Sequence, residues 1–278
     1  MPYRRPCRIK GCKPSITAND LKRALHAEEF ELYYQPQVDI ETGDIVGLET
    51  LLRWRHLVHG FIPPSEFITL AETTSLIVPV GEWVFNEACR QWKLWQSANE
   101  PRTIAVNVSS LQLQQRSFVR FVEGCLTQWQ IDPCQIEIEL VETVFIDRGA
   151  SNTVCELRDL GLRIAIDDFG TGYSSLSYLV THQVDRLKIP KEFVAHAPFD
   201  ARHAVIVRSM IKLARDLDID VVAEGVENQA QAGFLINAGC RHAQGFYYAT
   251  PTDAEGLTAL LHEGRIKSLS HASFLTTD

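Results

Sequence analysis

The sequence predicts an α/β fold, a single (β/α)8 barrel of the TIM type with one core. Strand-like apolar runs alternate with helical patterns along the 278 residues, and eight strands can be distinguished. Repeated strand-then-helix units form a mainly parallel sheet, and eight such units close into a barrel. A hydrophobic content of 45% in a chain of this length permits one large core. An open, doubly wound sheet is the alternative fold.

Two strands open the predicted domain, at residues 30–38 and 45–54, with the turn DIETGD between them. A helix over residues 63–72 follows, with Pro64 near its first turn and Ser65 as a candidate cap. The next helix, over residues 79–97, carries an apolar stripe typical of a helix that packs on a core. The stripe consists of Val80, Val84, Ala88, Trp92 and Trp95.

Strands and helices then alternate regularly to the end of the domain. The remaining strands are expected at residues 103–109, 135–142, 163–170, 184–189, 220–226 and 242–249. The remaining helices are expected at residues 117–129, 150–161, 174–179, 202–217, 228–239 and 253–263. The predicted domain therefore spans residues 17–264, with an N-terminal tail or linker at 1–16 and a C-terminal tail at 265–278.

The composition of the chain indicates which partners and which cellular compartment to expect. The net charge of -8 and the pI near 5.6 disfavour a basic surface for nucleic-acid polymers. Seven cysteines without a C-x-x-C pair predict reduced core thiols and a cytoplasmic protein. We find no apolar run of roughly 20 residues and no signal peptide. His56 and His59 are expected in a surface loop rather than in a zinc site.

Polar residues stand at the C-terminal ends of most predicted strands, where barrels of this type place their chemistry. They are Glu49, Asn107, Glu139, Glu142, Asp167, Asp168, Lys188, Glu224, Glu227 and Gln244. A single acidic residue at such a place is usually a solvated charge or a helix cap. Carboxylates that converge from several strands repel one another unless cations neutralise them. Oxygen ligands without His or Cys favour Mg²⁺ or Mn²⁺.

The adjacent Asp167 and Asp168 indicate a two-metal site, because one carboxylate can bridge two ions while the other binds the second. Two ions roughly 3.5–4 Å apart suit in-line displacement at phosphorus by an activated water molecule. Lys188 admits two interpretations. It either lies near that water, as a base or an orienting cation, or forms a salt bridge with the carboxylates.

The order and spacing of several motifs resemble those of the EAL-domain cyclic di-GMP phosphodiesterases. The motifs are GLETLLRW, AVNVS, IELVET, IDDFGTGYSSLSYL, DRLKI, VVAEGVEN and QGFYY, and the match runs from about Leu21 to Leu261. The resemblance implies a barrel whose first strand is antiparallel to the others. It also implies hydrolysis of cyclic di-GMP to linear 5′-pGpG with Mg²⁺ or Mn²⁺, two ions per site. A homodimer and, in a longer protein, an upstream sensor or GGDEF domain are implied as well.

The resemblance assigns roles to individual residues. The expected ligands of the first ion are Glu49, Asn107, Glu139 and Asp167. The expected ligands of the second ion are Asp167, which bridges, Asp168 and Glu224. The expected catalytic residues are Lys188, beside the attacking water, Glu49 and Glu227. The expected substrate contacts are Gln35, Leu51, Arg53, Asp168 and Gln244.

A glycine-rich loop after the fifth strand is expected to couple substrate and metal binding to dimerisation. Its residues include Phe169, Gly170, Thr171, Gly172 and Ser174, and Glu142 is expected to anchor it. The chain departs from the family pattern at Thr50, where Ala is usual, at Val141, where Thr is common, and at Pro190, where Asp is usual. Pro190 removes a carboxylate and a backbone donor, which is expected to lower the rate or shift Lys188.

Two other functions stay open at this point. The first is a domain that binds cyclic di-GMP as a receptor and relays the signal without hydrolysis. The second is a barrel hydrolase that acts on another phosphodiester, since fold alone does not identify a substrate.

Overall fold

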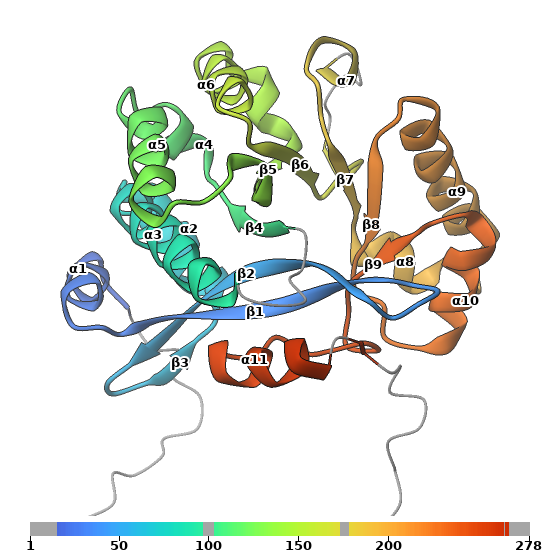
Figure 1. Cartoon of the computed structure of the whole chain (residues 1–278), viewed down its shortest axis with the longest axis horizontal. Helices are drawn as coiled ribbons and strands as arrows, with labels where there is room; N and C mark the ends of the chain where they lie inside the picture. The colour runs from blue at the N-terminus through green and yellow to red at the C-terminus, as the bar shows by residue number, and fades with distance from the viewer. Residues whose placement is uncertain (1–15, 97–102, 173–177, 264, 267–278) are drawn as a thin grey trace, which may run out of the picture.

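Eight strands close into a barrel in the computed structural model, which describes residues 16–96, 103–172, 178–263 and 265–266 (Figure 1). In ring order the strands are β1 (Phe30–Asp39), β2 (Ile45–His56), β4 (Thr103–Asn107), β5 (Ile136–Val141), β6 (Arg163–Asp167), β7 (Arg186–Ile189), β8 (Asp220–Ala223) and β9 (His242–Ala243). Strand β1 pairs with both β2 and β9, which closes the ring. The predicted barrel is confirmed, and the open sheet is excluded.

Strand β1 runs against its two neighbours, whereas all other adjacent strands of the ring are parallel. The reason is local, because only a short turn joins β1 to β2. Two strands with such a connection must be antiparallel, since a parallel pair needs a crossover of a dozen or more residues. The expectation of one antiparallel strand is therefore confirmed.

Helices cover the outside of the barrel (Figure 1). They are α1 (Ala18–His26), α2 (Pro64–Thr73), α3 (Ile77–Trp95), α4 (Ser110–Leu113), α5 (Phe118–Trp129), α6 (Arg148–Asp159), α7 (Tyr178–Thr181), α8 (Lys191–His196), α9 (Ala201–Asp216), α10 (Gln229–Ala238) and α11 (Ala254–Glu263). Two 3₁₀ turns, η1 (Pro133–Gln135) and η2 (Glu142–Ile146), flank β5. Among the described residues, none of the helices is both long and apolar enough to cross a membrane.

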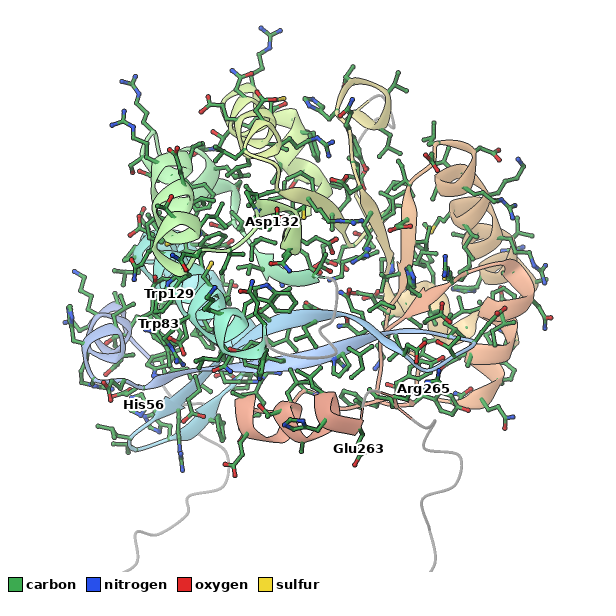
Figure 2. All side chains as sticks on the ribbon, viewed as in Figure 1. His56, Trp83, Trp129, Asp132, Glu263 and Arg265 are labelled. Carbon is green, nitrogen blue, oxygen red and sulfur yellow. The ribbon has the colours of Figure 1, made fainter. Side chains whose placement is uncertain are left out.

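The prediction for His56 was wrong. This residue ends β2, which continues into a hairpin with β3 (Gly60–Ile62), and its side chain is buried. The ring accepts hydrogen bonds from the backbone N–H groups of Val58 and His59 and lies 3.0 Å from an Arg23 nitrogen of α1. Figure 2 labels His56 in the region between α1 and β3. Polar local sequence concealed the burial, because α1 covers this position from a distant part of the chain.

Two further predictions need correction. Ser65 does not cap α2, because it lies inside the helix, which begins at Pro64 with Pro63 at the cap position. The last strand ends at Ala243 rather than at residue 249, because the backbone turns at Gly245. Gly245 has φ +156°, and a Cβ there would lie 2.2 Å from the carbonyl oxygen of Val226.

The apolar stripe of α3 faces the core as predicted, with all five of its residues buried. The described cysteines are free, but only Cys89, Cys125 and Cys240 are buried, whereas Cys134 and Cys155 are exposed. The expectation of core thiols therefore holds for three positions. Cys7 and Cys12 lie outside the described residues.

Candidate metal and phosphodiester site

The ends of the parallel strands bring the predicted polar residues to one rim of the barrel. Strand register places Asn107 of β4 beside Glu139 of β5, and Gln35 of β1 opposite Glu49 of β2. Asp167 ends β6, and Lys188 lies on β7. Because parallel strands end on the same side, residues far apart in the sequence meet there.

Lys188 lies at the centre of this rim and is completely buried. Its ammonium nitrogen lies 2.8 Å from Glu224, 2.9 Å from Glu139, 3.1 Å from Asp167 and 3.5 Å from Glu49. Burial disfavours the charged ammonium, but these carboxylates outweigh it and raise the pKa of Lys188 well above its usual value. Lys188 is thus an ion-pair partner of four carboxylates, as the salt-bridge interpretation anticipates.

Hydrogen bonds hold the Glu49 carboxylate in place. The Asn107 amide donates to Oε1 at 3.2 Å, and the Gln244 amide donates to Oε2. The same Gln244 nitrogen donates to Oε1 of Gln35 at 3.0 Å. Burial raises the pKa of Glu49, but Lys188 and these amides reverse the effect and lower it below the usual value. Glu49 is therefore held as a carboxylate with a fixed orientation.

Glu139 and Glu224 have the opposite character. Burial and the nearby Glu49 raise the pKa of Glu139 well above its usual value. Burial raises the pKa of Glu224 to about 7, although Lys188 opposes the shift. Oε1 of Glu139 is buried and has no hydrogen-bond partner among the described residues. Among the described residues, Lys188 contacts four carboxylates, more than one ammonium group can neutralise, so added positive charge would be stabilised there.

Asp167, Asp168 and Glu224 each present an oxygen to a common point, with these atoms within 4.8 Å of one another. Asp168 has φ 52°, a left-handed conformation that Asp adopts more readily than most residues. Its backbone N–H donates to Oδ1 of Asp167 at 3.0 Å. Burial and the Asp167 charge raise the pKa of Asp168. Such a group of hard oxygen donors, together with the unpartnered oxygen of Glu139, fits a divalent cation such as Mg²⁺ or Mn²⁺.

The loop after β6 is tied to the strand β5 side of the rim. The backbone N–H of Gly170 donates to Oε2 of the buried Glu142 at 3.3 Å. Gly170 has φ +84°, and a Cβ there would lie 2.5 Å from Cε of Met210. Thr171 donates from Oγ1 to the carbonyl oxygen of Asp168 at 2.8 Å. The side chain of Phe169 is buried.

Two loop predictions stand apart from this geometry. Gly172 is exposed and lies outside any helix or strand, and Ser174 lies outside the described residues. The bonds of Gly170 to Glu142 and of Thr171 to Asp168 nevertheless join the loop directly to the aspartate pair.

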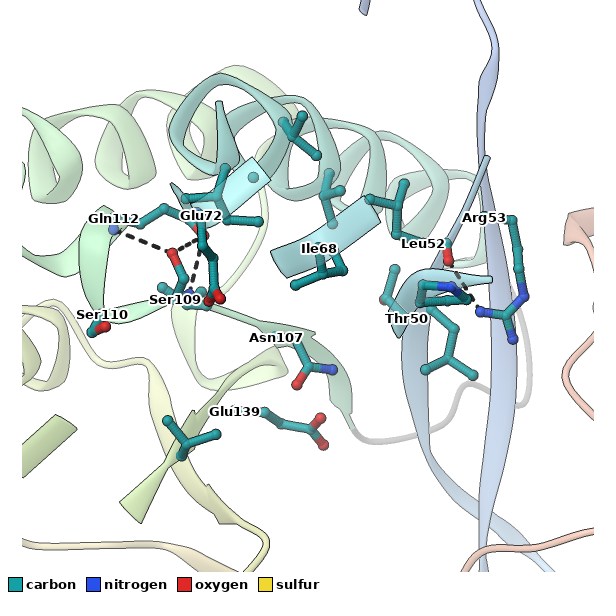
Figure 3. A pocket seen from close by; sticks show the side chains of 18 residues that line it. Thr50, Leu52, Arg53, Ile68, Glu72, Asn107, Ser109, Ser110, Gln112 and Glu139 are labelled. Atoms are coloured by element: carbon teal, nitrogen blue, oxygen red, sulfur yellow. Dashed lines mark hydrogen bonds between the residues drawn. The ribbon is translucent and has the colours of Figure 1, made fainter. Parts of the chain in front are cut away.

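A cavity opens beside the metal ligands (Figure 3). Asn107 and Glu139 form part of its wall, and Leu51 and Arg53 of β2 form another part. The Arg53 guanidinium lies 5.5 Å from the centre of the Tyr33 ring and donates to the carbonyl oxygen of Leu52 at 3.0 Å. The cavity therefore adjoins the carboxylate rim directly.

Glu227 lies apart from the Lys188 cluster. It is exposed and pairs with Lys191, the first residue of α8. Pro190 precedes that helix at its cap position with φ -61°, which suits proline. Two contacts of the site were missed from the sequence, namely Lys191 on the rim and α2 in the cavity wall. The spacing of Pro64, Ile68 and Glu72, four residues apart, is the signal for a shared helix face.

Comparison with known proteins identifies similar sequences. The family profile described as EAL domain matches residues 18–251. The chain is 43% identical over 244 residues to the bifunctional diguanylate cyclase/cyclic di-GMP phosphodiesterase MucR of Pseudomonas aeruginosa. This match covers 87% of this chain and 36% of MucR. It is 37% identical over 238 residues to the oxygen sensor protein DosP of Escherichia coli, covering 84% of this chain and 30% of DosP. The chain thus spans about a third of the length of these curated relatives.

Solved structures show the same likeness. The phosphodiesterase region of PaMucR in complex with c-di-GMP superimposes with a TM-score of 0.81 at 42% identity, covering 86% of this chain and 98% of that one. The EAL enzyme Bd1971, in its form with cAMP and cyclic di-GMP bound, gives a TM-score of 0.84 at 33% identity, covering 87% and 67% of the two chains.

Proposed function

Since the chain belongs to the EAL domain family, with a cyclic di-GMP phosphodiesterase among its relatives, we propose that it hydrolyses cyclic di-GMP to linear 5′-pGpG with divalent cations. The observation that carries the proposal is the surplus of carboxylates around Lys188. Such a surplus costs stability in a protein that binds no cation, and it supports phosphoryl chemistry in one that does.

The chain's own residues supply the ligands. Glu49, Asn107, Glu139 and Asp167 would hold one cation, and Asp167, Asp168 and Glu224 would hold a second. Bound divalent cations lower the pKa of a water molecule and neutralise charge on the phosphate oxygens.

Protein groups orient the reactants. Lys188 keeps a positive charge among the carboxylates, beside the place where water attacks. Gln244 and Asn107 fix the orientation of Glu49, so that its charge does not swing away from the rim. Arg53 offers a cation to a phosphate of the substrate from the cavity wall. The bond between Gly170 and Glu142 keeps the aspartate pair in register with the other ligands.

The direct test is turnover of cyclic di-GMP with Mg²⁺ or Mn²⁺, followed by chromatography. Appearance of pGpG, its loss in EDTA and its loss in Glu49→Ala support the proposal. Glu123→Gln, an exposed position on α5, is the matched control and should retain full activity. Tight binding of cyclic di-GMP without product would identify a receptor instead. Neither binding nor turnover would overturn both.

Dimerisation is a second part of the proposal. Ile146 and Val180 are 71% and 81% exposed. They flank a stacked pair of rings, Phe145 and Tyr178, whose centres lie 4.8 Å apart next to the anchored loop. A second copy that covers these side chains would restrain the loop. Light scattering with Ile146→Asp, read beside the turnover of the same samples, tests whether the dimer and the activity fall together.

A further inference from the structure

The cavity beside the metal ligands has a volume of about 330 Å³ and a mainly apolar lining. Ile68 of α2 and Ile77, Val80 and Val84 of α3 form its apolar walls. Asn107 and Glu139 belong to the same cavity, so it is continuous with the rim. A slot of this kind suits a flat aromatic ring whose attached phosphate lies at the rim.

Glu72 is the acidic residue of this cavity that lies away from the metal ligands. Pro64, Ile68 and Glu72 share one face of α2, because they are four residues apart. In the view of Figure 3, Glu72 lies on the side of Ser109, across the cavity from Arg53. Within the described residues, its carboxylate has neither a hydrogen-bond partner nor an ion-pair partner.

Two neighbouring polar side chains on this side, Ser109 and Gln112, are already bonded to each other. Oε1 of Gln112 accepts hydrogen bonds from the backbone N–H and the hydroxyl of Ser109, each at 3.1 Å. Gln112 also packs against Gly81, where a Cβ would lie 2.1 Å from its Nε2 atom. Glu72 therefore offers an unpaired carboxylate to a ligand at this side of the slot.

We propose that Glu72 determines base specificity by accepting hydrogen bonds from N1–H and N2–H of a guanine. This inference rests on the proposed function, because the guanine belongs to the cyclic dinucleotide whose phosphate lies at the rim. Guanine offers two adjacent N–H donors on this edge, which match the two oxygens of a carboxylate. Adenine presents an acceptor at N1, which a carboxylate repels, and hypoxanthine lacks the N2 amino group.

The test compares three substrates in the metal-loaded protein, namely cyclic di-GMP, cyclic di-IMP and cyclic di-AMP. The wild-type protein should prefer cyclic di-GMP over cyclic di-IMP by about 10- to 100-fold in kcat/KM, the usual effect of a hydrogen bond to a charged group. Glu72→Gln and Glu72→Ala should reduce this preference by a similar factor, mainly through KM. Glu66→Gln removes the same charge from α2 outside the cavity and should leave the preference unchanged.

The outcomes separate this inference from the proposed function. If the wild-type protein converts cyclic di-GMP but Glu72→Gln keeps the full preference for guanine, the role of Glu72 is refuted and the function stands. If the wild-type protein binds without turnover, the ratio of dissociation constants for the three ligands replaces kcat/KM, and an unchanged ratio in Glu72→Gln again refutes the role. If the wild-type protein neither binds nor converts cyclic di-GMP, both proposals fail.

Discussion

Both ends of the barrel bury a positively charged side chain among carboxylates, but the two ends differ in charge balance. At the N-terminal end of the strands, Arg186 bonds Glu137 at 2.9 Å and lies 3.8 Å from Asp220. Arg163 lies 3.6 Å from Glu137 and 3.2 Å from Asp220. Two guanidinium groups thus meet two carboxylates. At the C-terminal end, one ammonium group meets four carboxylates.

At one end the charges neutralise one another, whereas at the other end carboxylates outnumber the positive charge. A balanced network needs no ion from outside, and Gln37 completes it with an acceptor 3.1 Å from Arg186. An unbalanced rim attracts cations, and burial raises the pKa of its Glu139 and Glu224 carboxyl groups above the usual value. We therefore expect replacement of Lys188 to affect mainly turnover, and replacement of Arg186 to affect mainly stability.

Replacing Lys188 by Met should give the largest effect, on catalysis. Because the proposed function puts the positive charge of Lys188 beside the reacting phosphate, we expect turnover of cyclic di-GMP to fall by about 10³-fold, within the range for a positioned catalytic group. Single-turnover assays at saturating Mn²⁺ measure this loss. Turnover within a factor of a few of the wild-type value would remove Lys188 from the mechanism.

Replacing Arg186 by Met should act on stability. It leaves the fully buried Glu137 without its closest partner, which costs about 3–5 kcal/mol of unfolding free energy. Urea denaturation in EDTA measures the loss, and turnover at low temperature should stay near the wild-type value. The double variant Arg186→Met, Glu137→Leu is the control, since removal of both charges should recover part of the stability. A loss of turnover as large as that in Lys188→Met would show that the two ends are not separate.

Divalent cations should stabilise the protein through the C-terminal end alone. At a concentration 100 times the dissociation constant, Mn²⁺ should add about 2.7 kcal/mol, which raises the midpoint of thermal unfolding by about 5 °C. Glu139→Gln removes a buried ligand and should lose most of this gain, whereas Arg186→Met should keep it. Differential scanning calorimetry with and without EDTA distinguishes the two. An equal gain in Glu139→Gln would place the cation elsewhere.

The sequence predicted the barrel because each strand carries its own apolar pattern and each helix its own stripe. It also placed Glu49, Glu139, Asp167 and Lys188 at one rim, since strand ends are local features and parallel strands end on one side. These positions needed no knowledge of side-chain packing.

The remaining features depend on contacts between distant segments. The burial of His56 follows from the cover provided by α1. Glu227 forms an ion pair with Lys191 because α8 begins close to the segment that follows β8. The cavity that Glu72 lines is formed jointly by residues of α2, α3 and several strands. No pattern within a short window contains these contacts, so sequence reasoning could not reach them.

The smallest expected effect concerns His242 at the balanced end. Burial, and then the positive charge of Arg186, lower the pKa of His242 to about 4, although Asp220 and Asp39 oppose the shift. At pH 8 the ring is neutral in both the folded and the unfolded chain and has no influence on stability. As the pH falls from 6.5 towards 4, the unfolded chain takes up a proton that the folded chain refuses, so the free energy of unfolding decreases.

The size of this decrease is about 2 kcal/mol, after allowance for screening around the partly exposed ring. Urea denaturation of the wild-type protein and of His242→Gln between pH 7 and pH 4 measures it, because the shared carboxylates cancel in the difference. The variant should lose less stability than the wild-type protein across this window. Parallel curves for the two proteins would mean that His242 accepts a proton in the folded state, and the N-terminal end would then be less tightly balanced than its ion pairs indicate.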